Sequence, residues 1–284
     1  MPETHWVKKD NNLIQCLLCP HACLLEEGEK GRCRVRKNVA GKLVVQNYGL
    51  VTAMALDPIE KKPLYHFFPG KKILSLGTFG CNLRCAFCQN WQIAQQEKVN
   101  NYFLAPEAAV ARAKELVPLG NIGLAYTYSE PLMWYEYLLA TAQLAHEAGL
   151  KNVLVTNGYL NPQPLKQLLP FIDAVNLDLK AFEEGFYQEL CQATLHPVLQ
   201  SAKLLAENCH LEISTLLIPG KNDDQEQIKA LTQWIAALDR QIPLHLLRYF
   251  PNYKLSLAGT PLKTMWEAQK IAAQYLDYVY LGNV

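Results

Sequence analysis

The sequence lacks the features of an exported or membrane-spanning protein. None of its apolar runs approaches the ~18 residues of a transmembrane helix, and residues 1–10 contain no apolar stretch like that of a signal peptide. It also lacks an excess of one charge, with 27 Lys and Arg against 26 Asp and Glu and no long basic run. This balance argues against a protein that mainly binds nucleic acid, tRNA included, or an anionic membrane. We therefore expect a cytoplasmic protein without membrane attachment.

The high hydrophobic content excludes a disordered chain. Hydrophobic residues make up 50% of the 284 residues, which is enough for a full core. At roughly 100–200 residues per domain, the length fits one large domain with a small appendage. Because the beginning of the chain is polar and rich in Cys, we expect a metal-binding module and connector over 1–70 and the main domain over 71–284.

The cysteines are numerous and unevenly placed. Seven of the nine fall in the first 88 residues, in two tight sets, whereas Cys191 and Cys209 stand alone, as cysteines that fill a core do. An odd number without an export signal argues against a disulfide framework, because the cytosol keeps thiols reduced. Close-set thiolates in a reducing compartment indicate metal binding instead.

From about residue 72 short apolar runs alternate with amphipathic stretches. The predicted strands span residues 73–78, 122–128, 152–156, 174–179, 211–218 and 244–250. The predicted helices span residues 106–117, 131–148, 162–171, 197–207, 225–238 and 264–276. Strands that are apolar almost throughout are typical of a parallel sheet buried on both faces. Six βα repeats are two short of a closed barrel, and no Gly-rich phosphate loop follows the first strand. We therefore predict an α/β fold, a partial (β/α)6 barrel of the TIM type with a small N-terminal Cys-rich module.

The central motif comes directly after the first predicted strand, where Cys81, Cys85 and Cys88 form a C-x3-C-x2-C set. Three thiolates this close can surround one small inorganic body, since a fully extended chain of that length spans only ~25 Å. Ferredoxins hold a [4Fe–4S] cluster with four cysteines, so three would leave one iron open to a small molecule. The position agrees, because chemistry in α/β barrels lies at the carboxyl ends of the strands. The alternatives are a zinc site without its fourth ligand and a structural cluster completed by a distant cysteine.

A second set of four cysteines lies within 18 residues near the N-terminus, at Cys16, Cys19, Cys23 and Cys33. Structural zinc takes four closed ligands, so a zinc site held by all four is one interpretation. A second iron–sulfur cluster that feeds electrons to the first is the other. The sequence predicts a metal-binding knuckle here and leaves the metal open.

Several motifs together resemble a known family. A C-x3-C-x2-C set with an aromatic residue, Phe87, before its third cysteine is similar to the motif of radical SAM enzymes. Residues 16–23, 57–67, 77–91 and 177–180 further resemble the radical SAM component of the AmmeMemoRadiSam system, which is related to pyruvate formate-lyase activating enzymes. The resemblance covers nearly the whole chain.

The resemblance implies the cofactors. Cys81, Cys85 and Cys88 would hold the cluster, and its open iron would bind the amino and carboxylate groups of S-adenosylmethionine. Reductive cleavage of the sulfonium C–S bond would then give methionine and a 5′-deoxyadenosyl radical. The protein would orient the cofactor, with Phe87 beside it, and exclude water and oxidants.

Two strand ends are expected to hold the cofactor in this family. Glu130 inherits the role of binding the methionine amino group, although Tyr128 and Ser129 replace the usual glycine pair. The alternative is Ser129 as a helix N-cap with Glu130 complementing the helix dipole. Asn157 follows the third strand and is also expected at the cofactor, but Val155 replaces the usual Asp of this turn, so the role of that Asp is not inherited.

The fourth and sixth predicted strands carry charged candidates. Asp178 and Lys180 share one strand face, where two charges are costly unless paired or bound to a polar group. They match an activating-enzyme Asp-x-Lys motif and would contact the cofactor or the substrate, and a structural ion pair is the alternative. His245, on the same strand as Arg248, is expected near the cofactor or, alternatively, as a satisfied core histidine.

The resemblance also implies partners. These are an electron donor such as a flavodoxin or ferredoxin, and Memo-like and AMMECR-like proteins. The substrate is a protein backbone if the enzyme is a glycyl-radical activase, or else a small metabolite. Outside enzymes, the alternative is a zinc-binding interaction protein in which both Cys sets are structural.

Overall fold

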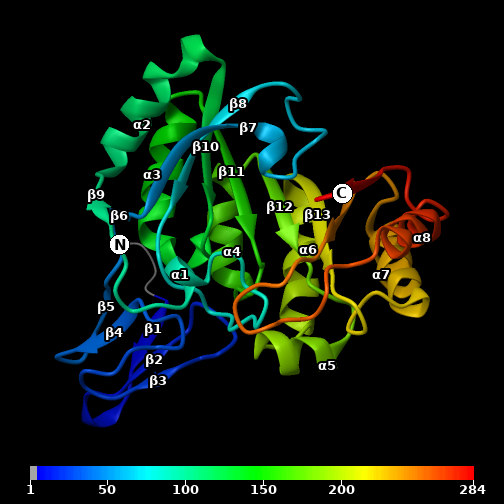
Figure 1. The fold of residues 1–284 in the computed structure, drawn as a ribbon. Coiled ribbons are helices and arrows are strands. Elements are labelled where there is room, and N and C mark those ends of the chain that lie inside the picture. The colour runs from blue at the N-terminus through cyan, green and yellow to red at the C-terminus, as the bar shows by residue number, and fades with distance from the viewer. Residues whose placement is uncertain (1–4) are drawn as a thin grey trace.

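The computed structural model describes residues 5–284, and its N-terminal part is a small strand-rich module (blue in Figure 1). An antiparallel sheet and a separate hairpin make up this module. The sheet consists of β1 (Trp6–Lys8), β2 (Ile14–Cys16) and β3 (Leu24–Leu25), and the hairpin of β4 (Arg36–Val39) and β5 (Lys42–Val45). Short β6 (Leu50–Val51) then pairs with β9 (Tyr102–Phe103).

The main domain is built on an open sheet of eight strands (Figure 1). Its six central strands are parallel and confirm the six predicted ones: β8 (Lys72–Gly77), β10 (Asn121–Thr127), β11 (Lys151–Thr156), β12 (Ala174–Asp178), β13 (His210–Leu217) and β14 (Leu244–Arg248). The sequence analysis missed the two edge strands, antiparallel β7 (Ala53–Pro58) and parallel β15 (Val279–Gly282). β15 is short and only half-buried, and β7 is a mixture of half-buried and exposed residues, so neither is buried like a central strand.

Helices follow the strands and pack on the outer side of the sheet. The six predicted helices are confirmed as α2 (Pro106–Glu115), α3 (Tyr135–Glu147), α4 (Pro162–Leu168), α6 (His196–Asn208), α7 (Gln225–Leu238) and α8 (Leu262–Ala272). Short turns of helix complete the connections: α1 (Trp91–Ala94), α5 (Glu184–Phe186), η2 (Ile59–Lys61), η4 (Pro131–Trp134) and η6 (Tyr187–Cys191), the last of π type. No helix among residues 5–284 is long and apolar enough to cross a membrane.

Strand periodicity sorts side chains between two cores. Leu74 and Leu76 of β8 join the large core between sheet and helices, whereas Ile73 of the same strand points to the inner side. There Ile73 packs in a small interior cluster with Val153 and Ala174 of neighbouring strands. Positions that alternate with the outer core therefore line the inside of the partial barrel, where the candidate site lies.

Candidate active site at the carboxyl ends of the strands

A cavity of about 560 Å³ occupies the inside of the barrel. Residues at the carboxyl ends of the strands and in the loops after them form one part of its wall, which we call the mouth: Cys81, Cys85, Phe87, Cys88, Glu130, Asn157, Asp178 and Lys180. Residues toward the amino ends form another part, which we call the floor: Lys62, Tyr65 and His245. The mouth thus gathers nearly all the residues that the sequence analysis assigned to the central cluster and its cofactor.

The three mouth cysteines lie on the loop after β8. Gly80 precedes this loop with φ +89°, and a Cβ there would lie 2.8 Å from the Cys33 carbonyl oxygen, so only glycine allows the turn and the close approach of the N-terminal module. Within the loop, the Leu83 N–H donates to Cys81 Sγ at 3.3 Å, and the Asn157 amide nitrogen lies 3.7 Å from the same sulfur.

Burial keeps these thiols protonated in the absence of a metal. It raises the pKa of Cys81 well above its usual value and that of Cys88 to about 11. For Cys85 the largest cause of its raised pKa is a hydrogen bond with the Cys191 side chain. Bound iron would supply the positive charge that these thiolates need. Three thiols on one wall of one cavity, otherwise unable to ionise, fit a metal cluster.

The cysteines fit a cluster better than a single ion. Within residues 5–284 no three Cys, His, Asp or Glu side chains are arranged to hold one metal ion. In a [4Fe–4S] cluster each thiolate binds a different iron, so the sulfurs need not converge on one point.

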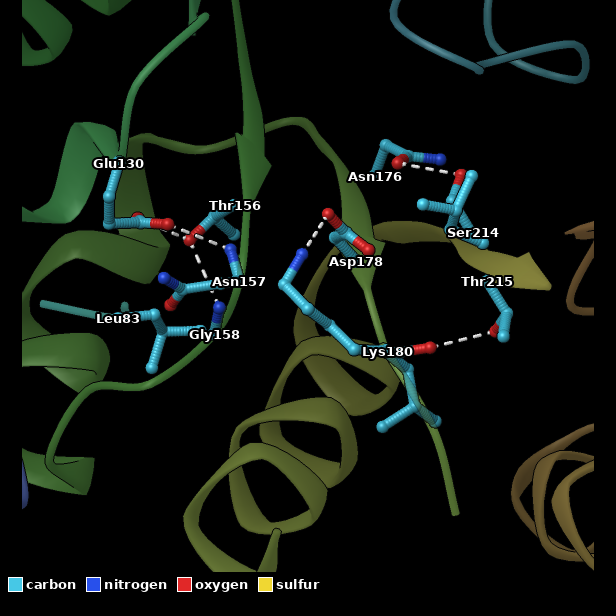
Figure 2. Close-up of polar contacts among 12 residues, drawn as sticks. Leu83, Glu130, Thr156, Asn157, Gly158, Asn176, Asp178, Lys180, Ser214 and Thr215 are labelled. Atoms are coloured by element: carbon cyan, nitrogen blue, oxygen red, sulfur yellow. Dashed lines mark hydrogen bonds and ion pairs between the residues drawn. The ribbon is translucent and has the colours of Figure 1, made fainter. Parts of the chain in front are cut away.

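Glu130 is held at the mouth by hydrogen bonds from the end of β11 (Figure 2) and from the first turn of η4. Its carboxylate accepts from the Thr156 hydroxyl at 2.6 Å, the Asn157 N–H at 2.8 Å and the Leu132 N–H at 3.1 Å. Burial nevertheless raises its pKa to about 7, since the side chain is almost fully enclosed. Glu130 is itself the N-cap of η4, which corrects the alternative that Ser129 caps this helix.

Asn157 connects Glu130 with the cysteine loop. Its backbone N–H binds Glu130, and its side-chain amide donates at 3.0 Å to Asn82, a fully buried residue of the cysteine loop. Asn82 in turn donates to the Tyr159 carbonyl at 2.6 Å. The Asn157–Gly158 turn is therefore a structural junction beside Cys81 and not an ordinary exposed turn.

Asp178 and Lys180 form an ion pair at the mouth (Figure 2). Lys180 is mostly buried, and although desolvation opposes its charge, Asp178 together with Cys85 and Cys191 raises its pKa well above the usual value. Its ammonium lies 5.9 Å from the centre of the Phe87 ring. Both predicted interpretations meet here, because the two residues pair with each other and also line the cavity.

The two candidates on β14, His245 and Arg248, lie in different surroundings. His245 lines the floor, near the amino end of its strand, and its Nε2 lies 2.6 Å from the Glu212 carboxylate. Arg248 does not line the cavity and donates to the Thr260 carbonyl at 2.7 Å. The structure therefore places neither beside the cysteine loop.

The four N-terminal cysteines lie together. Cys16, Cys19 and Cys33 are buried and Cys23 is half-buried. Burial, together with the charges of the other three cysteines, raises the pKa of Cys19 to about 12. Arg36 acts in the opposite direction on Cys16 and Cys33.

Arg36 itself is 1% exposed, and its Nε has no hydrogen-bond partner among residues 5–284. The Arg36 guanidinium pairs with Glu136 at 2.6 Å, and its free Nε–H lies near the buried thiols of Cys16 and Cys33, which fits a negatively charged metal–thiolate centre.

The N-terminal module contacts the mouth loop directly. His21 Nε2 lies 2.9 Å from the Asn82 carbonyl oxygen. The Arg84 guanidinium donates to the carbonyls of Arg32 and Cys81, which belong to the two cysteine sets. The two sets are therefore neighbours in the fold.

Sequence reasoning missed Cys191, which it treated as a core-filling cysteine. The Arg84 and Ala86 N–H groups, on either side of Cys85, donate at 2.9 Å to the Cys191 and Leu190 carbonyls of η6. These bonds fix the fully buried Cys191 beside Cys85. No spacing in the sequence could indicate this, because the two residues lie more than a hundred positions apart.

Comparisons with known proteins identify similar chains. Residues 75–232 match the family model of the radical SAM superfamily. The chain is 40% identical over 283 residues to an uncharacterized protein of Methanocaldococcus jannaschii, over 98% of this chain and 83% of that protein. It is 26% identical to the pyruvate formate-lyase 1-activating enzyme of Escherichia coli, over 69% of this chain and 86% of that enzyme. The solved structure of Streptococcus suis SuiB bound to S-adenosylmethionine shares the fold, with a TM-score of 0.57 at 17% identity over 74% of this chain and 51% of SuiB.

Proposed function

The chain belongs to the radical SAM superfamily, and from this membership we propose that its mouth holds a [4Fe–4S] cluster on Cys81, Cys85 and Cys88 with S-adenosylmethionine beside it. Homology to pyruvate formate-lyase activating enzymes makes it an enzyme of the radical SAM type. The observation that carries the proposal is the arrangement of three thiols, Glu130 and a charged pair around one cavity. When bound, the cluster supplies an electron that cleaves S-adenosylmethionine to methionine and a 5′-deoxyadenosyl radical, which removes a hydrogen atom from the substrate.

Glu130 has one acceptor position left for the cofactor. A carboxylate offers about four lone-pair sites, and Leu132, Thr156 and Asn157 occupy three of them. The remaining site suits an amino N–H of S-adenosylmethionine. Because three bonds fix the carboxylate, it would orient the amino group without reorganising.

Lys180 suits a carboxylate of the cofactor or of the substrate. Its ammonium has three donors, of which Asp178 takes one in the described part of the chain. Asp178 keeps the ammonium charged and in place, and the Phe87 ring covers it. Lys180 would thus bind an acid group, with Asp178 as the residue that positions it.

The N-terminal cysteines are proposed as a second metal site. Their mutual proximity and the unpartnered Arg36 Nε–H support a second iron–sulfur cluster. Zinc, the alternative, would require the thiols to converge further, because no three of them are arranged around one ion within residues 5–284. Iron analysis of a variant with Cys81, Cys85 and Cys88 all replaced by Ala separates the two. Remaining iron with a visible absorption band supports a cluster, and zinc alone supports a structural knuckle.

The proposal also covers the substrate, the electron donor and the partner proteins. The kinship with pyruvate formate-lyase activating enzymes supports a glycyl-radical activase as a second candidate function. EPR detection of a glycyl radical on a partner protein would test it. We further propose a flavodoxin or ferredoxin as donor and an association with Memo-like and AMMECR-like proteins of an AmmeMemoRadiSam system.

The direct test is anaerobic reconstitution with iron and sulfide, followed by dithionite and S-adenosylmethionine. We expect 5′-deoxyadenosine and methionine as products. The Cys85→Ala variant should form neither, whereas Cys209→Ala, which alters a cysteine away from the mouth, should form both. A fully loaded wild-type protein that forms no 5′-deoxyadenosine would refute the proposed function, and colourless protein that binds only zinc would favour an interaction module.

A further inference from the structure

Residues 59–67 close the amino ends of the strands. This segment leaves β7 at one edge of the sheet and reaches β15 at the other (Figure 1). Ile59 and Leu64 are fully buried in the interior cluster. His66 Nε2 lies 2.6 Å from the Tyr280 hydroxyl of β15. The floor of the cavity is therefore built from a fixed segment anchored on both edge strands.

Lys62 is the cation of the floor. It is buried, and its ammonium donates to Asp57 at 2.8 Å and lies 5.0 Å from the centre of the Tyr128 ring. Asp57 also accepts from the hydroxyls of Ser75 at 2.9 Å and Tyr128 at 3.0 Å. Although desolvation opposes them, these bonds lower the pKa of Asp57 to about 2, so the ion pair persists. Asp57 takes one of the three ammonium donors within residues 5–284.

Glu212 fixes the other side of the floor. Its fully buried carboxylate accepts from the N–H groups of Tyr65 at 3.0 Å and His66 at 2.7 Å, and lies 3.0 Å from His210 Nε2 and 2.6 Å from His245 Nε2. The Tyr65 ring meets the His245 ring edge to face, with 4.7 Å between centres. Four partners saturate the carboxylate, and its remaining task is to hold Tyr65 and His245 in place.

The floor presents donors to the cavity and keeps two carboxylates behind them. Lys62, Tyr65 and His245 line the cavity, whereas Asp57 and Glu212 do not. The Lys62 ammonium, fixed by a carboxylate behind it, can donate to an acidic group. The polar rings of Tyr65 and His245 line the wall beside it, and because His245 uses Nε2 on Glu212, only its Nδ1 is left for a ligand.

Of the segment 59–67, one carboxylate, that of Glu60, lines the cavity near the floor. It accepts the Gly70 N–H at 2.6 Å. Lys61 and Lys62 follow it on the same segment and also line the cavity, and both ammonium groups pair with Asp57 behind the wall, at 3.5 Å and 2.8 Å.

The size of the cavity limits the substrate. A single small-molecule site typically has about 300–1,000 Å³, and the 560 Å³ here must accommodate the reacting end of S-adenosylmethionine as well. A protein loop would have to enter and leave through the mouth as two chain segments. A small molecule needs no such room.

We propose, on the basis of the proposed radical function, that the substrate is a small organic acid whose carboxylate or phosphate group binds the floor at Lys62, Tyr65 and His245. The segment 59–67, which the chemistry at the cysteines leaves without a role, is then the specificity element of the enzyme. It fixes the acid group at the floor and leaves the rest of the molecule directed toward the mouth.

The anion site is tested by titrating inorganic phosphate and acetate into the loaded enzyme by calorimetry. We expect saturable binding of at least one anion, weakened about tenfold or more by Lys62→Met, since a charged hydrogen bond contributes about 1.5–3 kcal/mol. Lys71→Met, which removes an exposed lysine outside the cavity, should leave it unchanged. Iron content and thermal unfolding check that Lys62→Met folds, and Tyr65→Phe, which keeps the ring packing, should also weaken binding. Absence of saturable binding, or equal binding by Lys62→Met, would overturn the anion site.

The size of the substrate is tested with cell extract divided by dialysis. The dialysable fraction should increase 5′-deoxyadenosine formation several-fold above the rate with S-adenosylmethionine alone, and Lys62→Met should lose this increase. An increase confined to the retained protein fraction, or none in either fraction, would refute a small-acid substrate. If the loaded enzyme forms no 5′-deoxyadenosine at all, the proposed function fails, whereas the anion titration still reports on the floor.

Discussion

At the scale of single residues, the site depends on groups whose protonation the fold controls. Glu130 is enclosed yet bound by three donors, so burial and hydrogen bonding oppose each other and its pKa stands at about 7. Cys191 is pressed against Cys85, whose sulfur is a proposed cluster ligand. Both residues lead to measurable predictions.

S-adenosylmethionine should bind more tightly as Glu130 ionises. Because its pKa is raised to about 7, the carboxylate is mostly protonated at lower pH and loses its free acceptor site. We expect the ratio of wild-type to Glu130→Gln affinity to rise about tenfold between about pH 6 and about pH 8, measured by equilibrium dialysis with the loaded, oxidised enzyme. Glu115→Gln, an exposed carboxylate on α2, is the control. A ratio independent of pH would contradict the role of Glu130.

Cys191 should adjust the reduction potential of the cluster. Once Cys85 is ionised on iron, the adjacent Cys191 thiol can turn its S–H toward that sulfur. Such a bond would withdraw charge and favour the reduced state, since hydrogen bonds to cluster sulfurs set the potential. Cys191→Ala should lower the midpoint potential by roughly tens of millivolts, while Cys191→Ser keeps most of it. Redox titration followed by EPR measures this, with Cys209→Ala as control, and an unchanged potential in Cys191→Ala would exclude the contact.

At the scale of elements, the loop after β8 is the junction between the N-terminal module and the barrel. Its turn exists because Gly80 adopts φ +89° against Cys33 and Val35. The far end of the loop is held by η6, whose carbonyls accept the N–H groups on either side of Cys85. A single π-type turn thus positions a cysteine ligand, in agreement with the frequent occurrence of such turns at functional sites.

Gly80→Ala should destabilise this junction more than a glycine elsewhere. The new Cβ would lie 2.5 Å from Val35 and 2.8 Å from the Cys33 carbonyl oxygen, in addition to the unfavourable φ. Gly28 has φ +83° and nothing within 4 Å, so Gly28→Ala isolates the cost of φ alone, about 1–2 kcal/mol. We expect a larger loss of unfolding free energy and weaker iron loading for Gly80→Ala, measured by urea denaturation and iron analysis. Equal losses would mean that the module does not constrain the loop.

At the scale of the whole molecule, the segment 59–67 joins the two edges of an open sheet. Glu212 of β13 holds this segment through the backbone N–H groups of Tyr65 and His66, and it also binds His210 and His245 of the sheet. Although desolvation opposes them, these bonds lower its pKa to about 2. The folded protein therefore stabilises the ionised form of Glu212 more than the unfolded chain does.

Glu212→Gln should lower the free energy of unfolding by about 2–4 kcal/mol at neutral pH. A lowered folded-state pKa stabilises above the unfolded value of 4.5, and this stabilisation is lost as the pH falls toward about 2. Urea denaturation across this range should show wild-type stability falling more steeply with acidity than that of the variant. Parallel pH profiles would show that Glu212 does not hold the floor in this way.

The sequence by itself determined the six central strands, the helices that follow them and the thiols of both cysteine sets. Strands and helices were predicted from apolar periodicity, and the cysteine sets from close spacing. Both signals involve residues that are near neighbours along the chain. Short motifs at strand ends in the sequence also identified four candidate site residues, Glu130, Asn157, Asp178 and Lys180. The edge strands escaped prediction because their apolar runs, residues 53–56 of β7 and 279–281 of β15, are short, and the strands are only partly buried.

Only the tertiary structure decided which distant groups meet. Cys191 against Cys85, Asn82 against Asn157, and the N-terminal module against Gly80 join residues far apart in the chain. The same holds for the floor, where His245 turned from a cofactor candidate into the partner of Glu212. Such contacts depend on the order of the strands in the sheet and on the face at which each side chain lies. No local pattern in a single sequence indicates either of these.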